Sequence, residues 1–178
     1  MAHPALFLDR DGIFNELVFR DKSFHSPRSW DEVIHFSLAG LPQIKSLGFK
    51  LIMITNQPDI ERKIISQKFV EELHDFYQKQ YQLDRIYVCP YASNEHPLKK
   101  PNPGLFLLAQ KELDLDLSTS FLLGDTEKDT LAAKKCGISS ILWIREYNQN
   151  VQSDFRITSI KELMTILSQR SNFIQRKL

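Results

Sequence analysis

The chain alternates between short, continuous apolar runs and longer segments in which apolar residues recur every three or four positions. The continuous runs are bounded by turn-forming residues, which is typical of strands that are buried on both faces. Five strands are therefore predicted, at residues 5–8, 49–55, 85–89, 120–123 and 140–144.

Helical patterns lie between these runs. The clearest covers residues 67–81, whose apolar positions would share one helical face. Ser159 and Glu162 have the spacing of a capping box, so a further helix is expected to begin near Ile160. Three more helices are expected at about residues 41–46, 103–113 and 128–135. Strands that alternate with helices predict an α/β fold, with a doubly wound, mostly parallel, Rossmann-like sheet of five strands or more.

The 178 residues fit a single domain that covers residues 1–178, with no linker and no internal repeat. The tail after about residue 168 is expected to fray. Two polar segments, residues 14–30 and 91–100, interrupt the alternation and are expected to be loops. Each follows a predicted strand, and ligands of open α/β sheets bind outside the carboxyl ends of the strands. These loops should therefore border a binding site.

Composition narrows the class of protein. The formal net charge is +1, so no strong overall field favours nucleic acid or a membrane as a partner. The two cysteines, Cys89 and Cys136, cannot form a disulfide framework and suit a reducing compartment. The first residues lack the pattern of a secretory signal, and no apolar run is long enough to cross a membrane. We expect a cytoplasmic protein that is a monomer or a small homo-oligomer.

Polar side chains follow the predicted strands at the points where these end. In a parallel sheet such ends meet at one edge, where several carboxylates would repel one another unless a cation lay among them. Oxygen ligands together with a phosphate-bearing substrate indicate Mg²⁺, and hydroxyl and amino groups nearby suit a phosphoryl group. The residues concerned are Asp9, Asp11, Thr55, Asn56, Lys100, Asp125 and Asp129.

Four short segments resemble the motifs of the haloacid-dehalogenase (HAD) superfamily, and the resemblance covers residues 5 to about 144. More narrowly, they resemble the histidinol-phosphate phosphatase branch, which includes the D-glycero-D-manno-heptose 1,7-bisphosphate 7-phosphatases. The intervals between them cannot hold a separate cap domain, so a capless phosphatase is expected. The segments are Leu8-Asp9-Arg10-Asp11-Gly12, Ile54-Thr55-Asn56-Gln57, Lys100-Pro101-Asn102-Pro103-Gly104, and Leu123-Gly124-Asp125 through Asp129.

The resemblance implies a Mg²⁺-dependent phosphomonoesterase with an aspartyl-phosphate intermediate. Asp9 would attack phosphorus, and Asp11 would protonate the leaving oxygen and then take a proton from the hydrolytic water. Mg²⁺ would be held by Asp9, the backbone carbonyl of Asp11, and Asp125.

The remaining motif residues would support this reaction. Thr55 would bind a phosphoryl oxygen, and Lys100 would balance the charge of nucleophile and phosphate. Asp129 would orient Lys100 or a metal-bound water, and Gly12 would permit the tight turn after the nucleophile.

A small phosphorylated metabolite is the expected substrate, and a sugar phosphate is favoured. Asn15 and Arg62 stand where the heptose enzymes carry the same residues, so both are predicted to bind substrate. The alternative for Asn15 is a turn residue, and the alternative for Arg62 is an exposed residue at the start of a helix. Asn56 and Lys99 are also predicted to bind substrate, although Lys99 replaces an arginine of the relatives and loses its bidentate geometry.

Many relatives carry a zinc-binding loop that this chain has lost in part. Only Cys89 and His96 could bind a metal in this stretch, because Tyr91 and Leu98 replace two expected ligands. A structural zinc site needs four ligands. No zinc is therefore expected.

Three alternatives remain open. A histidinol-phosphate phosphatase would need acidic residues near the substrate amine, and Glu95 or Asp59 could serve. A polynucleotide 3′-phosphatase has a similar first motif, but the neutral charge indicates no basic groove. A non-catalytic binding protein on the same scaffold is the third, because a fold alone does not fix function.

Overall fold

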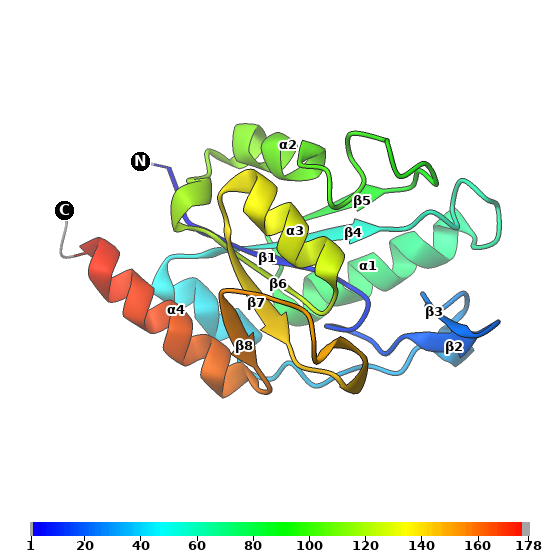
Figure 1. Ribbon diagram of the computed structural model, residues 1–178, viewed down its shortest axis with the longest axis horizontal. Coiled ribbons are helices and arrows are strands. Elements are labelled where there is room, and N and C mark those ends of the chain that lie inside the picture. The colour runs from blue at the N-terminus through cyan, green and yellow to red at the C-terminus, as the bar shows by residue number, and fades with distance from the viewer. Residues whose placement is uncertain (1, 176–178) are drawn as a thin grey trace.

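One parallel sheet forms the centre of the molecule (Figure 1). The computed structural model describes residues 2–175. Within them, six strands pair in the order β5-β4-β1-β6-β7-β8, and all five pairings are parallel. This confirms the predicted fold class. The strands are β1 (Ala5–Leu8), β4 (Lys50–Asn56), β5 (Arg85–Cys89), β6 (Phe121–Gly124), β7 (Ser139–Trp143) and β8 (Phe155–Ile157).

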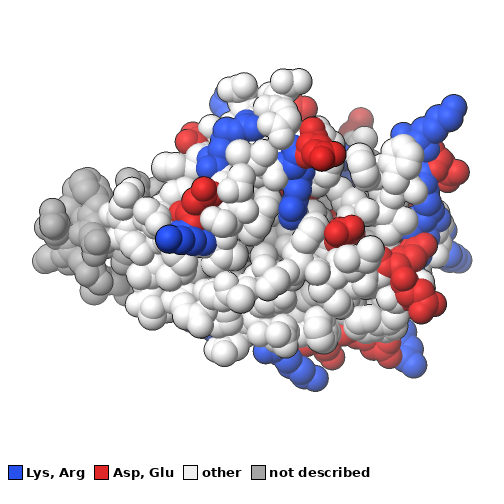
Figure 2. Space-filling model, turned by 90° about the horizontal axis from the view of Figure 1, so that it is seen from below, with Lys and Arg blue, Asp and Glu red and all other residues white. Residues whose placement is uncertain are grey.

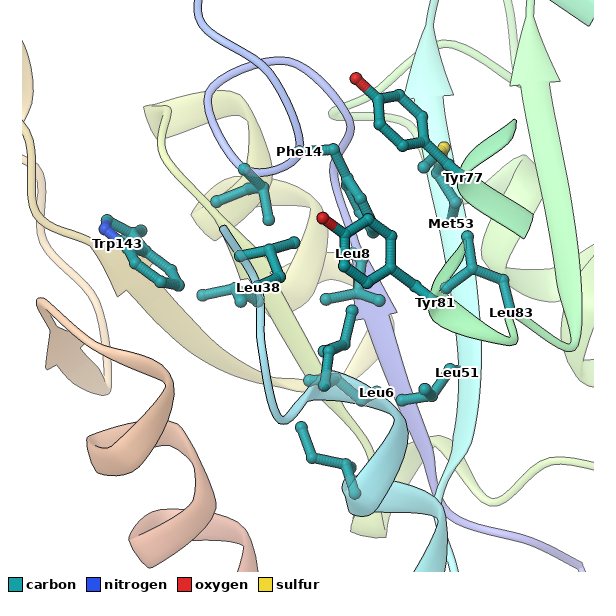
Figure 3. Close-up of a cluster of buried hydrophobic side chains, with 14 of the residues drawn as sticks. Leu6, Leu8, Phe14, Leu38, Leu51, Met53, Tyr77, Tyr81, Leu83 and Trp143 are labelled. Atoms are coloured by element: carbon teal, nitrogen blue, oxygen red, sulfur yellow. The ribbon is translucent and has the colours of Figure 1, made fainter. Parts of the chain in front are cut away.

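Helices cover both faces of the sheet (Figure 1). Side chains of β1 alternate between the faces: Phe7 packs with residues of α2 and α3, and Leu6 packs with residues of α1, α4 and η2. Figure 3 shows part of the second cluster. The helices are α1 (Gln67–Tyr81), α2 (Gly104–Leu113), α3 (Glu127–Cys136) and α4 (Ile160–Gln175), with 3₁₀ turns η1 (Trp30–Glu32), η2 (Leu41–Leu47), η3 (Leu117–Thr119) and η4 (Glu146–Asn148).

Three local features add detail to the expected pattern. The segment from Leu41 is a 3₁₀ helix, confined between Gly40 and Gly48, which both have positive φ and cap its two ends. The strand β8 was not predicted, because two of its three side chains are exposed and it lacks an apolar run. Helix α4 extends to Gln175, and residues 176–178 lie outside the described residues. The fraying of the tail stays a prediction.

The segment 14–30 is not a plain loop. It contains an antiparallel hairpin of β2 (Val18–Arg20) and β3 (Ser23–His25). The two turn residues, Asp21 and Lys22, both have positive φ, which matches the twist of a tight hairpin. Neither is the glycine that normally signals such a turn, so the sequence pattern missed it. The hairpin lies at the end of the sheet toward which β4 and β5 point (Figure 1).

Two helices begin at serine residues whose side chains accept a hydrogen bond from the first turn. Ser66 accepts a hydrogen bond from the backbone of Phe69 and begins α1. Ser159 accepts one from the backbone of Glu162, whose carboxylate caps the backbone of Thr158. None of the helices among the described residues has the length and apolar character that a membrane span would need.

Candidate active site

Four charged side chains meet at the carboxyl edge of the sheet. Asp9 follows β1 and Asp125 follows β6, and these two strands are neighbours. Lys100 comes from the loop after β5, and Asp129 from the first turn of α3. A pocket of about 330 Å³ opens here, lined by Asp9, Lys100 and Asp129 among others. A larger hollow, of about 530 Å³, lies at the other end of β7 and contains none of these residues.

Lys100 bridges two of the carboxylates. Its Nζ lies 2.8 Å from Asp9 Oδ1 and 2.7 Å from Asp129 Oδ1. Burial disfavours the charged lysine, but the two carboxylates outweigh it and raise the pKa of Lys100 above its ordinary value. Burial raises the pKa of Asp9 to about 7, although the charge of Lys100 opposes the shift. Lys100 is thus a fixed cation beside the predicted nucleophile.

Three carboxylates are placed to hold a cation. Oxygen atoms of Asp9, Asp125 and Asp129 lie within 4.8 Å of one another. Asp125 is fully buried, and its Oδ1 has no hydrogen-bond partner. Burial, with the charges of Asp129 and Asp9, raises the pKa of Asp125 to about 8. A hard divalent cation such as Mg²⁺ fits this set of oxygens, because it would satisfy the unpartnered atom and offset the repulsion.

The Asp11 carboxylate is held by four donors. Its oxygens accept hydrogen bonds from Asn15 Nδ2 (2.9 Å), Gln57 Nε2 (2.9 Å) and Ser26 Oγ (2.8 Å), and from the guanidinium of Arg10 (3.0 Å). Burial opposes ionisation, but Arg10 and the other donors hold the pKa of Asp11 below its ordinary value. Asn15 is fully buried and is absent from the pocket lining. The structure thus places Asn15 beside Asp11, whose carboxylate it supports. Its binding of substrate stays a prediction.

Arg10 is a site residue whose contacts the sequence did not reveal. The side chain is fully buried, and besides Asp11 it contacts Gln57 Oε1 (2.9 Å) and His74 Nε2 (3.2 Å). Burial, helped by the charge of Arg10, lowers the pKa of His74 to about 3. Because arginine can only donate, the neutral His74 ring accepts at Nε2. Arg10 thus connects the end of β1 to β4 and α1.

Of the two residues predicted at the end of β4, Asn56 lines the pocket, whereas Thr55 is buried and does not. Thr55 Oγ1 accepts from Gln57 Nε2 at 2.8 Å, which leaves the hydroxyl hydrogen free to donate. The Asn56 side chain lines the pocket and forms two bonds of 3.0 Å with the backbone N–H and C=O of Lys100. Asn56 thereby fixes the loop that carries Lys100.

Cationic side chains border the outer part of the pocket. The predicted Arg62 and Lys99 both line it, as does Lys128, which the sequence analysis did not single out. Arg62 also pairs with Asp59 at 3.0 Å. Burial, together with the charges of Lys128 and Arg62, lowers the pKa of Lys99. Lys128 lies in the first turn of α3, so its position follows from the turn that also carries Asp129.

In the segment that resembles a zinc loop, the side chain of His96 contacts residues of the same segment. His96 stacks on Tyr91, with ring centroids 3.7 Å apart, and its Nδ1 accepts a hydrogen bond from the backbone of Leu98. Cys89 is buried, and burial raises the pKa of its thiol. These contacts leave the absence of zinc as a prediction.

Gly12 is required by the packing of Asp125. It has a φ of +82°, and a Cβ there would lie 1.9 Å from Asp125 Oδ2. We expect Gly12→Ala to lower kcat/KM about 100-fold, because it displaces a residue of the metal cluster by the order of an ångström. Steady-state phosphate release would measure this effect.

Gly48→Ala is the matched control. Gly48 has a φ of +91°, but nothing lies within 4 Å of its Cβ position. Both variants should lose about 1–2 kcal/mol of stability from backbone strain. Gly12→Ala should lose more because of the clash with Asp125, and only this variant should lose activity. Equal activity in the two variants would show that Asp125 tolerates displacement.

Comparisons with known proteins support one class. A family model described as HAD-hydrolase-like matches residues 97–150. Among solved structures, a HAD-like phosphatase of Mesorhizobium loti is 27% identical, with a TM-score of 0.75, over 96% of this chain and 87% of that one. A D,D-heptose 1,7-bisphosphate phosphatase of B. bronchiseptica, complexed with magnesium and phosphate, has a TM-score of 0.75 at 20% identity over 98% and 99% of the two chains. Fold and site define a HAD-like phosphatase, a phosphoric monoester hydrolase.

Proteins with similar sequences identify the family within this class. The D-glycero-beta-D-manno-heptose-1,7-bisphosphate 7-phosphatase of Helicobacter pylori is 35% identical over 93% of this chain and 98% of its own length. The D-glycero-alpha-D-manno-heptose-1,7-bisphosphate 7-phosphatase of Burkholderia mallei is 36% identical over 81% of each chain. The chain belongs to the family of heptose-1,7-bisphosphate 7-phosphatases within the HAD-like hydrolases.

Proposed function

We propose that the protein removes the 7-phosphate of D-glycero-D-manno-heptose 1,7-bisphosphate in a Mg²⁺-dependent reaction. The observation that carries the chemistry is the placement of the Asp9 carboxylate at the end of a central strand, 2.8 Å from the buried Lys100 ammonium and beside Asp125. The similarity to named relatives over nearly the whole chain supports the substrate. The cytoplasm stays the proposed location.

Asp9 is the proposed nucleophile. An Asp9 oxygen bonds to phosphorus as the ester bond to the sugar oxygen breaks, and Asp11 donates a proton to that oxygen. Water then attacks the aspartyl-phosphate, and Asp11 takes its proton. In the structure Asp11 is held in the ionised form by its donors, the form that the second step needs. For the first step Asp11 must carry the proton that it donates.

The other site residues are proposed to bind the metal ion and the charged phosphoryl group. Asp9, Asp125 and the backbone carbonyl of Asp11 are the proposed ligands of Mg²⁺, which when bound neutralises negative charge at the phosphoryl group. The free hydroxyl hydrogen of Thr55 suits a phosphoryl oxygen. Lys100 balances the charge of Asp9 and phosphate, and it is held in place by Asp129 at 2.7 Å.

The outer pocket suits a second anionic group. Lys99, Lys128 and Arg62 gather there, and a bisphosphate carries its second phosphate away from the reacting one. The histidinol-phosphate alternative is weaker, because Asp59 is paired with Arg28 and Arg62 and is not free for a substrate amine. Its other candidate residue, Glu95, is not among the lining residues.

The formal net charge of +1 does not favour nucleic acid as a substrate. In the face drawn in Figure 2, basic and acidic side chains are interspersed, without a continuous basic stripe. A groove that follows a phosphate backbone needs such a stripe. A small phosphorylated sugar, bound by a monomer or a small homo-oligomer, is therefore the proposed partner.

Phosphate release with Mg²⁺ tests the substrate. Both anomers of heptose 1,7-bisphosphate should be compared with histidinol phosphate, because the relatives include enzymes named for each anomer. We expect one anomer to exceed histidinol phosphate at least about tenfold in kcat/KM, the difference that one well-placed ionic contact provides. Arg62→Gln should reduce that preference. Faster hydrolysis of histidinol phosphate would refute the heptose assignment and leave the phosphatase class intact.

A further inference from the structure

A segment outside the four motifs reaches the metal cluster. It comprises Arg145 and the turn η4, which directly follow the loop after β7. Arg145 Nη2 donates to the backbone carbonyl of Gly12 at 2.7 Å. Asn148 Nδ2 donates to the backbone carbonyl of Asp125 at 2.7 Å. Tyr147 donates its hydroxyl hydrogen to Asp125 Oδ2. The segment therefore fixes Asp125 through its backbone and its side chain.

We propose that Tyr147 is a positioning residue for the metal: it holds Asp125 Oδ2 and thereby presents Oδ1 to the cation. This inference rests on the Mg²⁺ site of the proposed function. Asp125 is fully buried, so neither oxygen can turn to water. Tyr147 occupies Oδ2, and Oδ1 is the one side-chain oxygen of this carboxylate that lacks a partner among the described residues. Such an atom is costly unless a ligand satisfies it.

Residues that hold a metal ligand from behind set the affinity of a metal site. Their loss typically weakens metal binding about 10- to 100-fold, because the ligand is free to rotate and must be ordered when the metal binds. Without the Tyr147 hydroxyl, Asp125 would present two unpartnered oxygens in a buried site. The repulsion from Asp9 and Asp129 would then rotate the carboxylate out of the arrangement that suits a cation.

The Tyr147 ring has a separate contact. It packs against Phe24 of β3, with ring centroids 5.1 Å apart, and Phe24 packs against Phe19 of β2 at 5.3 Å. Phe24 lines the pocket, so the Tyr147 ring packs the β2–β3 hairpin against the pocket wall. Tyr147 itself is 44% exposed, so nothing in the core depends on its ring. Hydroxyl and ring can therefore be removed one at a time.

The test is Mg²⁺ titrated into EDTA-treated protein and followed by calorimetry, for the wild type and Tyr147→Phe. We expect Tyr147→Phe to raise the Kd for Mg²⁺ about 10- to 100-fold. At saturating Mg²⁺ the KM for heptose 1,7-bisphosphate should stay within about twofold, because the ring remains in place. Tyr147→Leu removes the ring as well and should also raise that KM.

Tyr87→Phe is the matched control. Tyr87, on the edge strand β5, also donates to a carboxylate, Glu112 Oε2 at 2.8 Å, and it lies outside the pocket. Its Kd for Mg²⁺ should equal that of the wild type. The unfolding temperature of each metal-free variant shows whether it folds. If Tyr147→Leu does not fold, the isosteric Tyr147→Phe still allows the Kd for Mg²⁺ to be compared with that of the wild type.

The outcomes separate this inference from the proposed function. An unchanged Kd for Mg²⁺ in Tyr147→Phe overturns the inference, even if the wild type hydrolyses the bisphosphate. A wild type that binds no Mg²⁺ overturns it as well. A wild type that binds Mg²⁺ but releases no phosphate overturns the proposed function, and the comparison of Kd values then still decides the role of Tyr147.

Discussion

Asp9→Asn is expected to lower kcat about 10⁴-fold or more, because an amide cannot form the covalent phosphoryl intermediate. The change is nearly isosteric, and Lys100 keeps its bond to Asp129 at 2.7 Å. Phosphate release at saturating Mg²⁺ and substrate measures the loss. Asp75→Asn, on the exposed face of α1, is the matched control and should keep wild-type turnover.

A measurement of stability separates lost chemistry from lost fold. Burial raises the pKa of Asp9 to about 7, well above the value of an aspartate in the unfolded chain. Between those two values the folded protein binds more protons than the unfolded chain, so ionised Asp9 costs stability as the pH rises through about 7. At pH 8 without metal, Asp9→Asn should therefore unfold at no lower temperature than the wild type. Wild-type turnover in Asp9→Asn would remove Asp9 from the reaction.

Lys100→Met is expected to have the second-largest effect, on stability and on rate. It leaves Asp9 and Asp129 buried without their shared cation, and breaking a buried ion pair from one side typically costs about 3–5 kcal/mol. Loss of a charge aimed at the reacting group should lower kcat about 10²- to 10³-fold. Denaturant unfolding of the metal-free protein and steady-state kinetics measure the two effects.

Mg²⁺ should restore part of the stability of Lys100→Met, since a cation among the carboxylates replaces some of the lost charge. Lys68→Met is the matched control: Lys68 pairs with Glu72 at 3.7 Å, but its side chain is 85% exposed. That pair should contribute less than about 1 kcal/mol. If Lys100→Met were as stable and as active as Lys68→Met, the cationic bridge would have no role.

The sequence predicted the central sheet because its strands are buried on both faces and read as continuous apolar runs. Asp9 and Asp125 were predicted to meet since both directly follow such runs, and the parallel pairing of β1 with β6 brings them together. Lys100 was also expected near this edge, but its role came only from the resemblance to a family, because a loop residue carries no periodic signal. In the structure, carboxylate oxygens of Asp9, Asp125 and Asp129 lie close to one another. The expected set of metal ligands, with the Asp11 carbonyl in place of Asp129, stays a prediction.

Other contacts could not be predicted, because they depend on tertiary packing between distant segments. Arg10 lies between two acidic residues, which suggests an exposed charge, yet it is fully buried against Gln57 and His74. Tyr147 lies outside every motif and reaches Asp125 only because β7 returns beside β6. Asn15 follows the turn after β1, and the hydrogen bond from its side chain to Asp11 could not be predicted from its position in the sequence.

The order of strands also has a consequence for the nascent chain during synthesis. The nucleophile strand β1 is among the first segments made, but its partner β6 pairs with it 115 residues later, as Leu6 with Phe121. Such distant pairings are slow to form and cannot begin before the later strand exists. Until β6 is made, the hydrogen-bonding edge of β1 that it occupies has no partner strand, and Asp9 stays apart from Asp125. For most of its synthesis, the growing polypeptide therefore has no site that could bind metal or phosphate.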